Sequence, residues 1–372
     1  MIYADHAATT AISPIAREAM KTWLEDQYGN PSTLYRFAHE PRKAIDHARE
    51  IIANAIGALP EEIYFTSGGT ESDNWAIKGV AFRNIEKKCR IITSNIEHHA
   101  VLNVCQFLEK IGHSVEYLPV NEKGLVNPIQ LKSIMTDSVD LVSIMLANNE
   151  IGSIQPIRDL AAIAHETGCL MHTDAVQAVG HIPIDVNELG VDLLSASAHK
   201  FNGPKGVGFL YIRKGVKLEP LIHGGAQEKH MRAGTENVAG IIGMAIALEE
   251  HIKNLEYEME YLNGLRSIMI TALKETNLNY IINGSDVRIP GSLSISFKGI
   301  EGERILHRLD LMGTAIATGS ACDSFTAVLS HVIRAIEVPD EYAYGTIRIT
   351  LGMDNTPEQA KMIIDQINKI IK

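Results

Sequence analysis

The feature that most constrains the fold is an alternation of short apolar runs with amphipathic helical stretches. Seven runs are expected as β-strands: Ile63–Thr66, Ile91–Thr93, Val115–Leu118, Leu141–Leu146, Leu170–Thr173, Leu193–Ala196 and Gly208–Ile212. Several are apolar almost throughout, which is typical of strands buried on both faces of a sheet. Helical patterns such as Ala100–Ile111 and Ala161–Thr167 lie between them. The alternation indicates βαβ units and predicts an α/β fold around a mainly parallel seven-stranded sheet.

After Thr235 the pattern changes. A long proline-free helix, two strands and a closing helix are expected over Glu236–Lys274, Gly291–Lys298, Thr314–Thr318 and Thr356–Ile371. A chain of 372 residues has room for a large domain and a smaller companion. We therefore predict a large domain over residues 14–250 and a smaller α+β domain made of residues 1–13 and 251–372, with the long helix joining them.

Charge and cysteine content exclude several classes of protein. The sequence has 34 Lys and Arg against 45 Asp and Glu, a net charge of −11, which speaks against general binding to nucleic acid or to an anionic membrane. Its four cysteines lie far apart without zinc-binding or redox spacing. The N-terminus lacks signal-peptide features, and the most apolar stretch, Val238–Leu248, is shorter than the ~20 residues of a bilayer span. We expect a cytoplasmic protein without a metal site.

A glycine-rich turn follows the first expected strand. Ser67-Gly68-Gly69-Thr70 would open a helix, where free backbone N–H groups point outward and the glycines admit an anion close to the backbone. This arrangement suits a phosphate group. An ordinary tight turn with a helix cap has the same signature, and these residues alone leave both interpretations open. Their spacing matches neither a P-loop nor a dinucleotide-binding fingerprint.

Two further strands end in polar residues at the same edge of the expected sheet. Asp174 follows one strand, with Gln177 on the same face if the chain turns helical there, and Lys200 follows the next. Taken singly, Asp174 could be a helix cap and Lys200 a surface lysine. Taken together, a phosphate cradle, a carboxylate for a pyridinium nitrogen and a lysine for an aldehyde match the three contacts of pyridoxal phosphate.

A series of motifs carries a resemblance that runs from Tyr3 to about Gly352, in order and at matching spacing. The motifs are SGGTESDN (67–74), EHHAVL (97–102), NNEIG (148–152), DAVQ (174–177), SAHK (197–200), RAGT (232–235) and GSAC (319–322). They resemble the NifS/IscS cysteine desulfurases, which belong to the class V aminotransferase group of fold-type I pyridoxal-phosphate enzymes. The resemblance implies that fold, that cofactor and the conversion of L-cysteine to L-alanine.

The resemblance also implies roles for individual residues. Lys200 matches the lysine that binds the cofactor covalently, Asp174 the partner of the pyridinium nitrogen, and Gln177 the donor to the phenolic oxygen. Cofactor contacts, most of them to the phosphate, are implied for Gly69, Thr70, Asn149, Ser197 and His199, and for Thr235 across a homodimer with shared active sites. Asn149 and Arg348 match the substrate-holding groups, with Arg348 on the α-carboxylate.

His98 matches an imidazole that stacks over the cofactor ring and serves as an acid or base. Without the resemblance, the pair His98-His99 could be half of a metal site or a structural histidine. No further metal ligands follow at a suitable spacing, which leaves the structural histidine. The resemblance implies ring stacking instead.

Cys322 decides which reaction the cofactor serves. Its segment, TGSACDS (318–324), has the glycine- and serine-rich composition of an exposed loop, although Asp323 opposes thiolate formation and free cysteines are usually buried. The resemblance implies that Lys200 removes the α-proton of L-cysteine and that Cys322 takes the sulfur as a persulfide for an acceptor protein. Cys89, Cys105 and Cys169 are expected to be structural.

Two departures from the family pattern bear on the pathway. Val328-Leu329 stands where housekeeping members carry Glu-Pro, and the sequence ends at Lys372, before the tail that docks the iron–sulfur scaffold in those members. Both favour a specialised acceptor in tRNA thiolation or DNA phosphorothioation over iron–sulfur assembly. A selenocysteine lyase, an aminotransferase on the same fold and an inactive acceptor-binding subunit stay open as alternatives.

Overall fold

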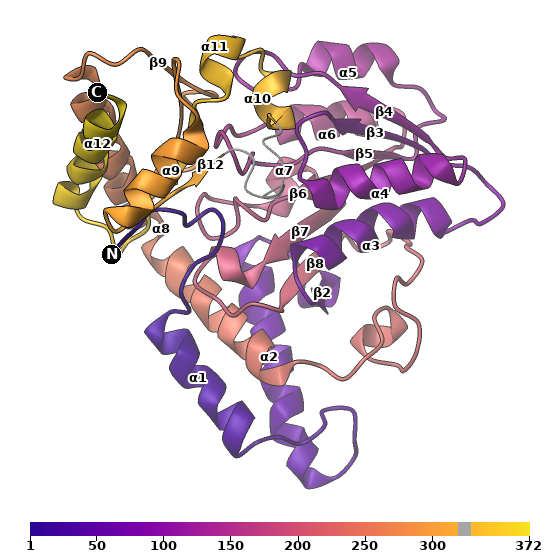
Figure 1. The fold of residues 1–372 in the computed structure, drawn as a ribbon. Helices are drawn as coiled ribbons and strands as arrows, with labels where there is room; N and C mark the ends of the chain where they lie inside the picture. Colours follow the sequence, from indigo (N-terminus) through magenta and orange to yellow (C-terminus); the bar gives the residue numbers. More distant parts are fainter. Residues whose placement is uncertain (319–328) are drawn as a thin grey trace.

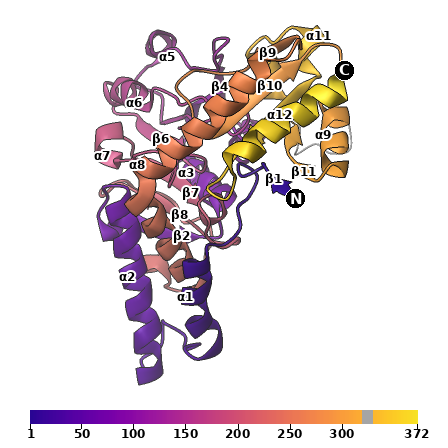
Figure 2. The ribbon, with the colours of Figure 1, turned by 90° about the vertical axis from the view of Figure 1, so that its left-hand side faces the viewer.

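The computed structural model describes residues 1–318 and 329–372, and it contains two sheet-centred parts bridged by one long helix (Figures 1 and 2). The strands are β1 (Ile2–Tyr3), β2 (Ile63–Thr66), β3 (Arg90–Ser94), β4 (Ser114–Leu118), β5 (Leu141–Ser143), β6 (Leu170–Asp174), β7 (Leu193–Ser197), β8 (Gly208–Ile212), β9 (Tyr280–Ile282), β10 (Ser292–Phe297), β11 (Thr314–Ala315), β12 (Ala317–Thr318) and β13 (Thr346–Thr350). The α-helices are α1 (Pro14–Glu25), α2 (His39–Ala55), α3 (Gly69–Phe82), α4 (His99–Lys110), α5 (Pro128–Ile134), α6 (Ile157–His165), α7 (Val186–Leu189), α8 (Val238–Lys274), α9 (Gly302–Leu311), α10 (His331–Ala335), α11 (Asp340–Ala343) and α12 (Pro357–Ile371).

The larger sheet has seven strands within the described residues, in the order β2-β8-β7-β6-β5-β3-β4. Every neighbouring pair is parallel except the two pairs made by β8. The predicted mainly parallel seven-stranded sheet is therefore confirmed. The strand expected over Leu141–Leu146 was too long, because the regular ladder ends at Ser143, although the N–H of Leu146 still donates to the carbonyl of Asp174 at 2.8 Å.

Helices cover both faces of this sheet, as Figure 1 shows. Because successive strand residues point to opposite faces, neighbours such as Leu193 and Leu194 enter different cores. Leu193 packs in the cluster with α3 and α4, whereas Leu194 packs in the cluster with α2, α6 and α8. Both side chains are fully buried, which stabilises each by about 1.5–3 kcal/mol. Burial on both faces explains why these strands are apolar throughout.

Helix α8 connects the two cores. Its first half places Met244 and Leu248 in the core of the larger sheet, and its second half places Leu265 and Met269 in the core of the smaller part. The long helix expected over residues 236–274 is thus present as Val238–Lys274. Neither α8 nor another helix within residues 1–318 and 329–372 combines the length and apolar character needed to cross a membrane. The domain boundary near residue 250 stays a prediction.

The smaller part contains an antiparallel sheet, β12-β13-β10-β9, and a two-stranded parallel pair, β1-β11. Helix α12 runs beside the second half of α8 (Figure 2). The single strand expected over Thr314–Thr318 was wrong, because the chain changes sheets there. Thr314 and Ala315 pair with β1, Ile316 intervenes, and Ala317 and Thr318 pair with β13.

A buried ion pair holds the segment between β8 and α8 against the larger sheet. The two Nη atoms of Arg49 contact the carboxylate of Glu228 at 2.8 and 2.7 Å, and the N–H of Phe65 donates to the same carboxylate at 2.9 Å. Residues 228–230 all have positive φ (42°, 57° and 67°), a backbone that costs non-glycine residues of order 1–3 kcal/mol each. The ion pair therefore offsets strain in the turn that leads to Thr235.

Replacing Arg49 by methionine should lower the free energy of unfolding by about 3–5 kcal/mol, because Glu228 would stay buried without a counter-charge. The matched control is Lys21→Met, which breaks an ion pair with Glu18 whose side chains are 54% and 71% exposed. The control should cost less than about 1 kcal/mol. Chemical denaturation followed by circular dichroism measures both. Equal losses in the two variants would contradict the role assigned to Arg49.

Candidate active site

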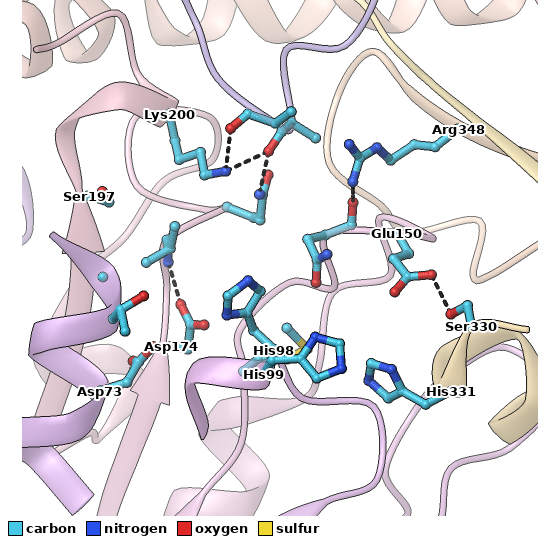
Figure 3. Close-up of a pocket in the computed structure, with 18 of the residues that line it drawn as sticks. Asp73, His98, His99, Glu150, Asp174, Ser197, Lys200, Ser330, His331 and Arg348 are labelled. Atoms are coloured by element: carbon cyan, nitrogen blue, oxygen red, sulfur yellow. Dashed lines mark hydrogen bonds between the residues drawn. The ribbon is translucent and has the colours of Figure 1, made fainter. Parts of the chain in front are cut away.

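One cavity of about 450 Å³ lies at the carboxyl ends of the parallel strands, between the larger sheet and the smaller part (Figure 3). All the predicted site residues except two line it: Gly69, Thr70, His98, Asn149, Asp174, Gln177, Ser197, His199, Lys200 and Arg348. Of the exceptions, Thr235 is exposed on the surface of its own chain, and Cys322 lies outside the described residues. Strands β2, β3, β5, β6 and β7 each lead into one of these segments, so sheet topology assembles the site.

Lys200 ends a short 3₁₀ turn that follows β7. Its Nζ atom donates to the carbonyl oxygens of Ala7 and Ala8 at 2.7 and 2.8 Å, as Figure 3 shows. The Nε2 atom of His181 lies 2.9 Å from the Lys200 carbonyl oxygen and donates to it. The lysine is therefore held at the cavity wall from both its backbone and its amine, and the interpretation as a solvated surface lysine is wrong.

Asp174 is the last residue of β6 and is 5% exposed. Its Oδ1 atom accepts from the N–H of Val176 at 2.9 Å. Burial raises the pKa of Asp174 to about 6, while that N–H group and the charge of Lys200 oppose the rise. A cation placed against this carboxylate would be strongly favoured, because desolvation leaves its charge poorly compensated.

Residues 176–180 form turns rather than a regular helix, so the condition under which Asp174 and Gln177 would share a helical face is not met. The Oδ1 atom of Asp174 accepts from the N–H two residues on, as a capping side chain does, and the N–H of Val179 donates to the carbonyl oxygen of Ala175 at 3.0 Å. Gln177 reaches the cavity nonetheless, and its Nε2 atom donates to the carbonyl oxygen of Ala7 at 2.9 Å.

The turn before α3 has the glycine-rich geometry expected of an anion cradle. Gly68, with φ of 146°, precedes α3. Because glycine has no side chain, it does not cap the first N–H groups of the helix. A Cβ atom at Gly69 would lie 2.6 Å from Cγ2 of Val176, so only glycine fits there. A hollow of about 320 Å³ beside this turn is lined by Ser197, His199 and Lys205, among others. The helix dipole and the lysine both favour an anion in this hollow.

His98 caps α4. Its Nδ1 atom accepts from the N–H of Ala100 at 3.1 Å, so the proton of the neutral ring lies on Nε2. Burial, Lys200 and His99 lower the pKa of His98 to about 4. At neutral pH the ring is therefore uncharged, and it lines the cavity beside Asp174 and Lys200.

Arg348 comes from the middle of β13 and is 5% exposed. Its Nη2 atom lies 2.6 Å from Oδ1 of Asp5, and its Nη1 atom donates to the carbonyl oxygen of Asn149 at 2.9 Å. The buried Nε atom has no hydrogen-bond partner within the described residues. The guanidinium is thus oriented by the protein, and both of its Nη atoms are already partly engaged.

Sequence reasoning assigned no role to several residues of the cavity wall: Asp73, His99, Glu150, Ser330, His331 and Arg334. Asp73 and Glu150 stand inside recognised motifs. Asp73 lies one helical turn from Gly69, and this spacing could have identified it as a residue of the same site. Ser330 donates to the carboxyl of Glu150 at 2.6 Å, and burial raises the pKa of Glu150 to about 7. That contact joins residues 180 positions apart, so no local pattern could reveal it.

The donor set fits pyridoxal phosphate. The cradle before α3 suits the phosphate, the Asp174 carboxylate suits a protonated ring nitrogen, and the Lys200 amine suits the aldehyde. All three border the cavity of about 450 Å³, which is within the ~300–1,000 Å³ range of small-molecule sites. Fold and site together define an α/β enzyme of the fold-type I pyridoxal-phosphate class.

Comparison with known proteins identifies the family. The family model "Aminotransferase class-V" matches residues 2–363, so the chain belongs to this family, whose members depend on pyridoxal phosphate. Cysteine desulfurase IscS of Dictyoglomus turgidum is 54% identical, covering 100% of this chain and 94% of the relative. A solved NifS-like protein is 39% identical with a TM-score of 0.94, covering 100% and 99% of the two chains. A structure of SspA in complex with cysteine is 36% identical with a TM-score of 0.85, covering 95% and 99%.

Proposed function

We infer that the protein is a pyridoxal-phosphate-dependent cysteine desulfurase that converts L-cysteine to L-alanine and passes the sulfur to an acceptor protein. The observation that carries this function is the convergence of Lys200, Asp174 and the start of α3 on one cavity. Full-length relatives named cysteine desulfurase support the reaction type. The similar SspA structure with cysteine supports the substrate.

Each side chain then has a definite task. Bound in the cavity, pyridoxal phosphate supplies an electron sink that makes the α-C–H bond of an amino acid acidic. Asp174 stabilises the positive charge at the ring nitrogen, and Lys200 anchors the aldehyde and takes the α-proton at Nζ. The neutral ring of His98 lines the same cavity, where it would contact the bound cofactor and could donate from Nε2. The positions of the three groups around one cavity support these roles.

The substrate is held by Arg348 and Asn149. Arg348 lines the cavity and would bind the α-carboxylate through its remaining Nη protons, while Asp5 keeps the guanidinium plane in place. Cys322 then attacks the substrate sulfur, so that an S–S bond forms and the C–S bond breaks. Protonation of the remaining three-carbon fragment yields alanine.

A homodimer with shared active sites completes the proposal. Thr235 is exposed rather than directed into its own cavity, as a residue that contacts the neighbouring subunit's phosphate would be. Large apolar side chains stand exposed around α1 and α2, including Leu24 at 65% and Leu34 at 90%, and a second copy would cover them. The buried thiols of Cys89, Cys105 and Cys169 suit a reducing cytoplasm.

One departure from the family pattern bears on the identity of the sulfur acceptor. Val328-Leu329 in place of Glu-Pro favours a specialised acceptor, in tRNA thiolation or DNA phosphorothioation, over iron–sulfur assembly. Sulfur delivery to a protein is common to all three pathways.

The test is product analysis of the purified protein with pyridoxal phosphate and L-cysteine. Alanine and protein-bound persulfide should form in equal amounts, and L-serine, the matched control without sulfur, should yield no alanine. A keto acid product would instead indicate an aminotransferase, and turnover of selenocysteine alone would indicate a selenocysteine lyase. Absence of both turnover and a cofactor absorbance band would indicate an inactive binding subunit.

A further inference from the structure

A second buried carboxyl group, Asp73, lies beside Asp174 and is not used by the proposed mechanism. Asp73 is on α3, lines the cavity and is 1% exposed. Figure 3 shows its side chain on the same wall as Asp174. Its Oδ1 atom has no hydrogen-bond partner among the described residues and lies 3.7 Å from Nε2 of His172. An ionised carboxylate in this position would be costly, because its charge is neither solvated nor hydrogen-bonded at that oxygen.

His172 does not supply a compensating positive charge. The ring is fully buried, with Nδ1 2.8 Å from the Ser143 hydroxyl and Nε2 3.0 Å from the Ser195 hydroxyl. A neutral imidazole satisfies both contacts, since one nitrogen donates and the other accepts. Burial lowers the pKa of His172 to about 3, so the ring is neutral at physiological pH.

The neighbouring charges decide which carboxyl group ionises. Asp174 receives the N–H of Val176 and faces the charge of Lys200, and both favour its anion. Burial raises the pKa of Asp73 well above its usual value. The charges of Asp174 on β6 and of Glu97 before α4 add to the rise, against an opposing hydrogen bond with Ser195. Two neighbouring buried carboxyl groups do not both ionise, so the proton belongs on Asp73.

We propose that Asp73 is a positioning residue that stays protonated in the resting enzyme, so that the single negative charge of the Asp73–Asp174 pair lies on Asp174. The proposal adds to the proposed function. It rests on that function only in taking the cation that Asp174 faces to be the ring nitrogen of pyridoxal phosphate. A neutral Asp73 lines the cavity wall beside Asp174 and does not attract the proton of the ring nitrogen, as a second anion would. An ionised Asp73 would compete with Asp174 for that proton.

The test compares Asp73→Asn with wild type by infrared spectroscopy at neutral pH, with and without pyridoxal phosphate. The asparagine amide has the shape of the protonated acid but cannot ionise, so the carbonyl band of a protonated carboxyl group should be lost. Wild-type protein labelled with ¹³C at aspartate carboxyl groups should show an isotope shift of the same band, which requires no substitution. Absence of a protonated aspartate band from the wild-type protein, or its persistence unchanged in Asp73→Asn, would overturn the proposal.

A second measurement reads the cofactor itself. With ¹⁵N-labelled pyridoxal phosphate bound, the ring-nitrogen resonance should indicate a protonated ring in wild type and in Asp73→Asn, and an unprotonated ring in Asp174→Asn. Loss of the ring proton in Asp73→Asn would show that Asp73 is itself the anionic partner. Failure of the protein to bind pyridoxal phosphate would contradict the proposed function, while the infrared band of the free protein would still decide the protonation of Asp73.

Discussion

Alanine at position 200 should abolish turnover of L-cysteine, lowering kcat by at least about 10³-fold. The substitution removes the amine that anchors the cofactor and takes the α-proton, and general acid–base catalysis alone is worth about 10²–10⁴-fold. The structure predicts little damage to the fold. The lost contacts include the two hydrogen bonds from Nζ to the carbonyl oxygens of Ala7 and Ala8 at the cavity wall.

The measurement for Lys200→Ala is alanine production with excess pyridoxal phosphate, together with the visible absorbance of the bound cofactor. The matched control is Lys214→Ala, which removes a lysine whose side chain is 71% exposed and which pairs with Glu61 outside the cavity. The control should keep wild-type turnover and absorbance. Turnover by Lys200→Ala within tenfold of wild type would remove this lysine from the mechanism.

Replacing Cys322 by alanine should eliminate both persulfide and alanine formation while the cofactor stays bound. No other group can take the place of a thiolate that must form an S–S bond. The described residues on either side of the 319–328 segment support this role by their positions. Ala317 pairs with Arg348 across β12 and β13, and Ser330 lines the cavity at the start of α10. The described residues that flank the segment therefore lie at or near the cavity.

Mass spectrometry of the protein after reaction with L-cysteine measures the persulfide. The matched control is Cys169→Ala, because burial raises the pKa of that thiol to about 12 and keeps it protonated. The control should form persulfide as the wild type does. Undiminished sulfur transfer by Cys322→Ala, or its loss in Cys169→Ala, would assign the nucleophile to another residue.

The parts of the fold that could be predicted are those in which burial acts on consecutive residues. Leu193 and Leu194 are both apolar because each faces a core, and this local pattern predicts a two-faced strand correctly. The turn after Asp174 and the change of sheets at Ile316 could not be predicted in this way. The first involves a side-chain contact to the backbone, and the second depends on strand partners distant in sequence.

The residues of the site also fall into two groups, those that a local pattern could predict and those that it could not. Residues that meet the cofactor through local geometry, such as Gly69 at a helix start and Asp174 at a strand end, carry a recognisable motif. Residues that act through partners distant in sequence do not. Asp5 orients Arg348 from 343 positions away, and Ser330 contacts Glu150 from 180 positions away.

By itself, then, the amino-acid order determined the strand-and-helix alternation, the family motifs and the chemical identity of the groups at the strand ends, because each depends on a few neighbouring residues. Only the tertiary structure decided how those groups act together. It placed the unpartnered oxygen of Asp73 near His172 and brought the carbonyl groups of Ala7 and Ala8 onto Lys200. Protonation depends on every charge and dipole packed around a buried group, and most of these come from elements far apart in the chain.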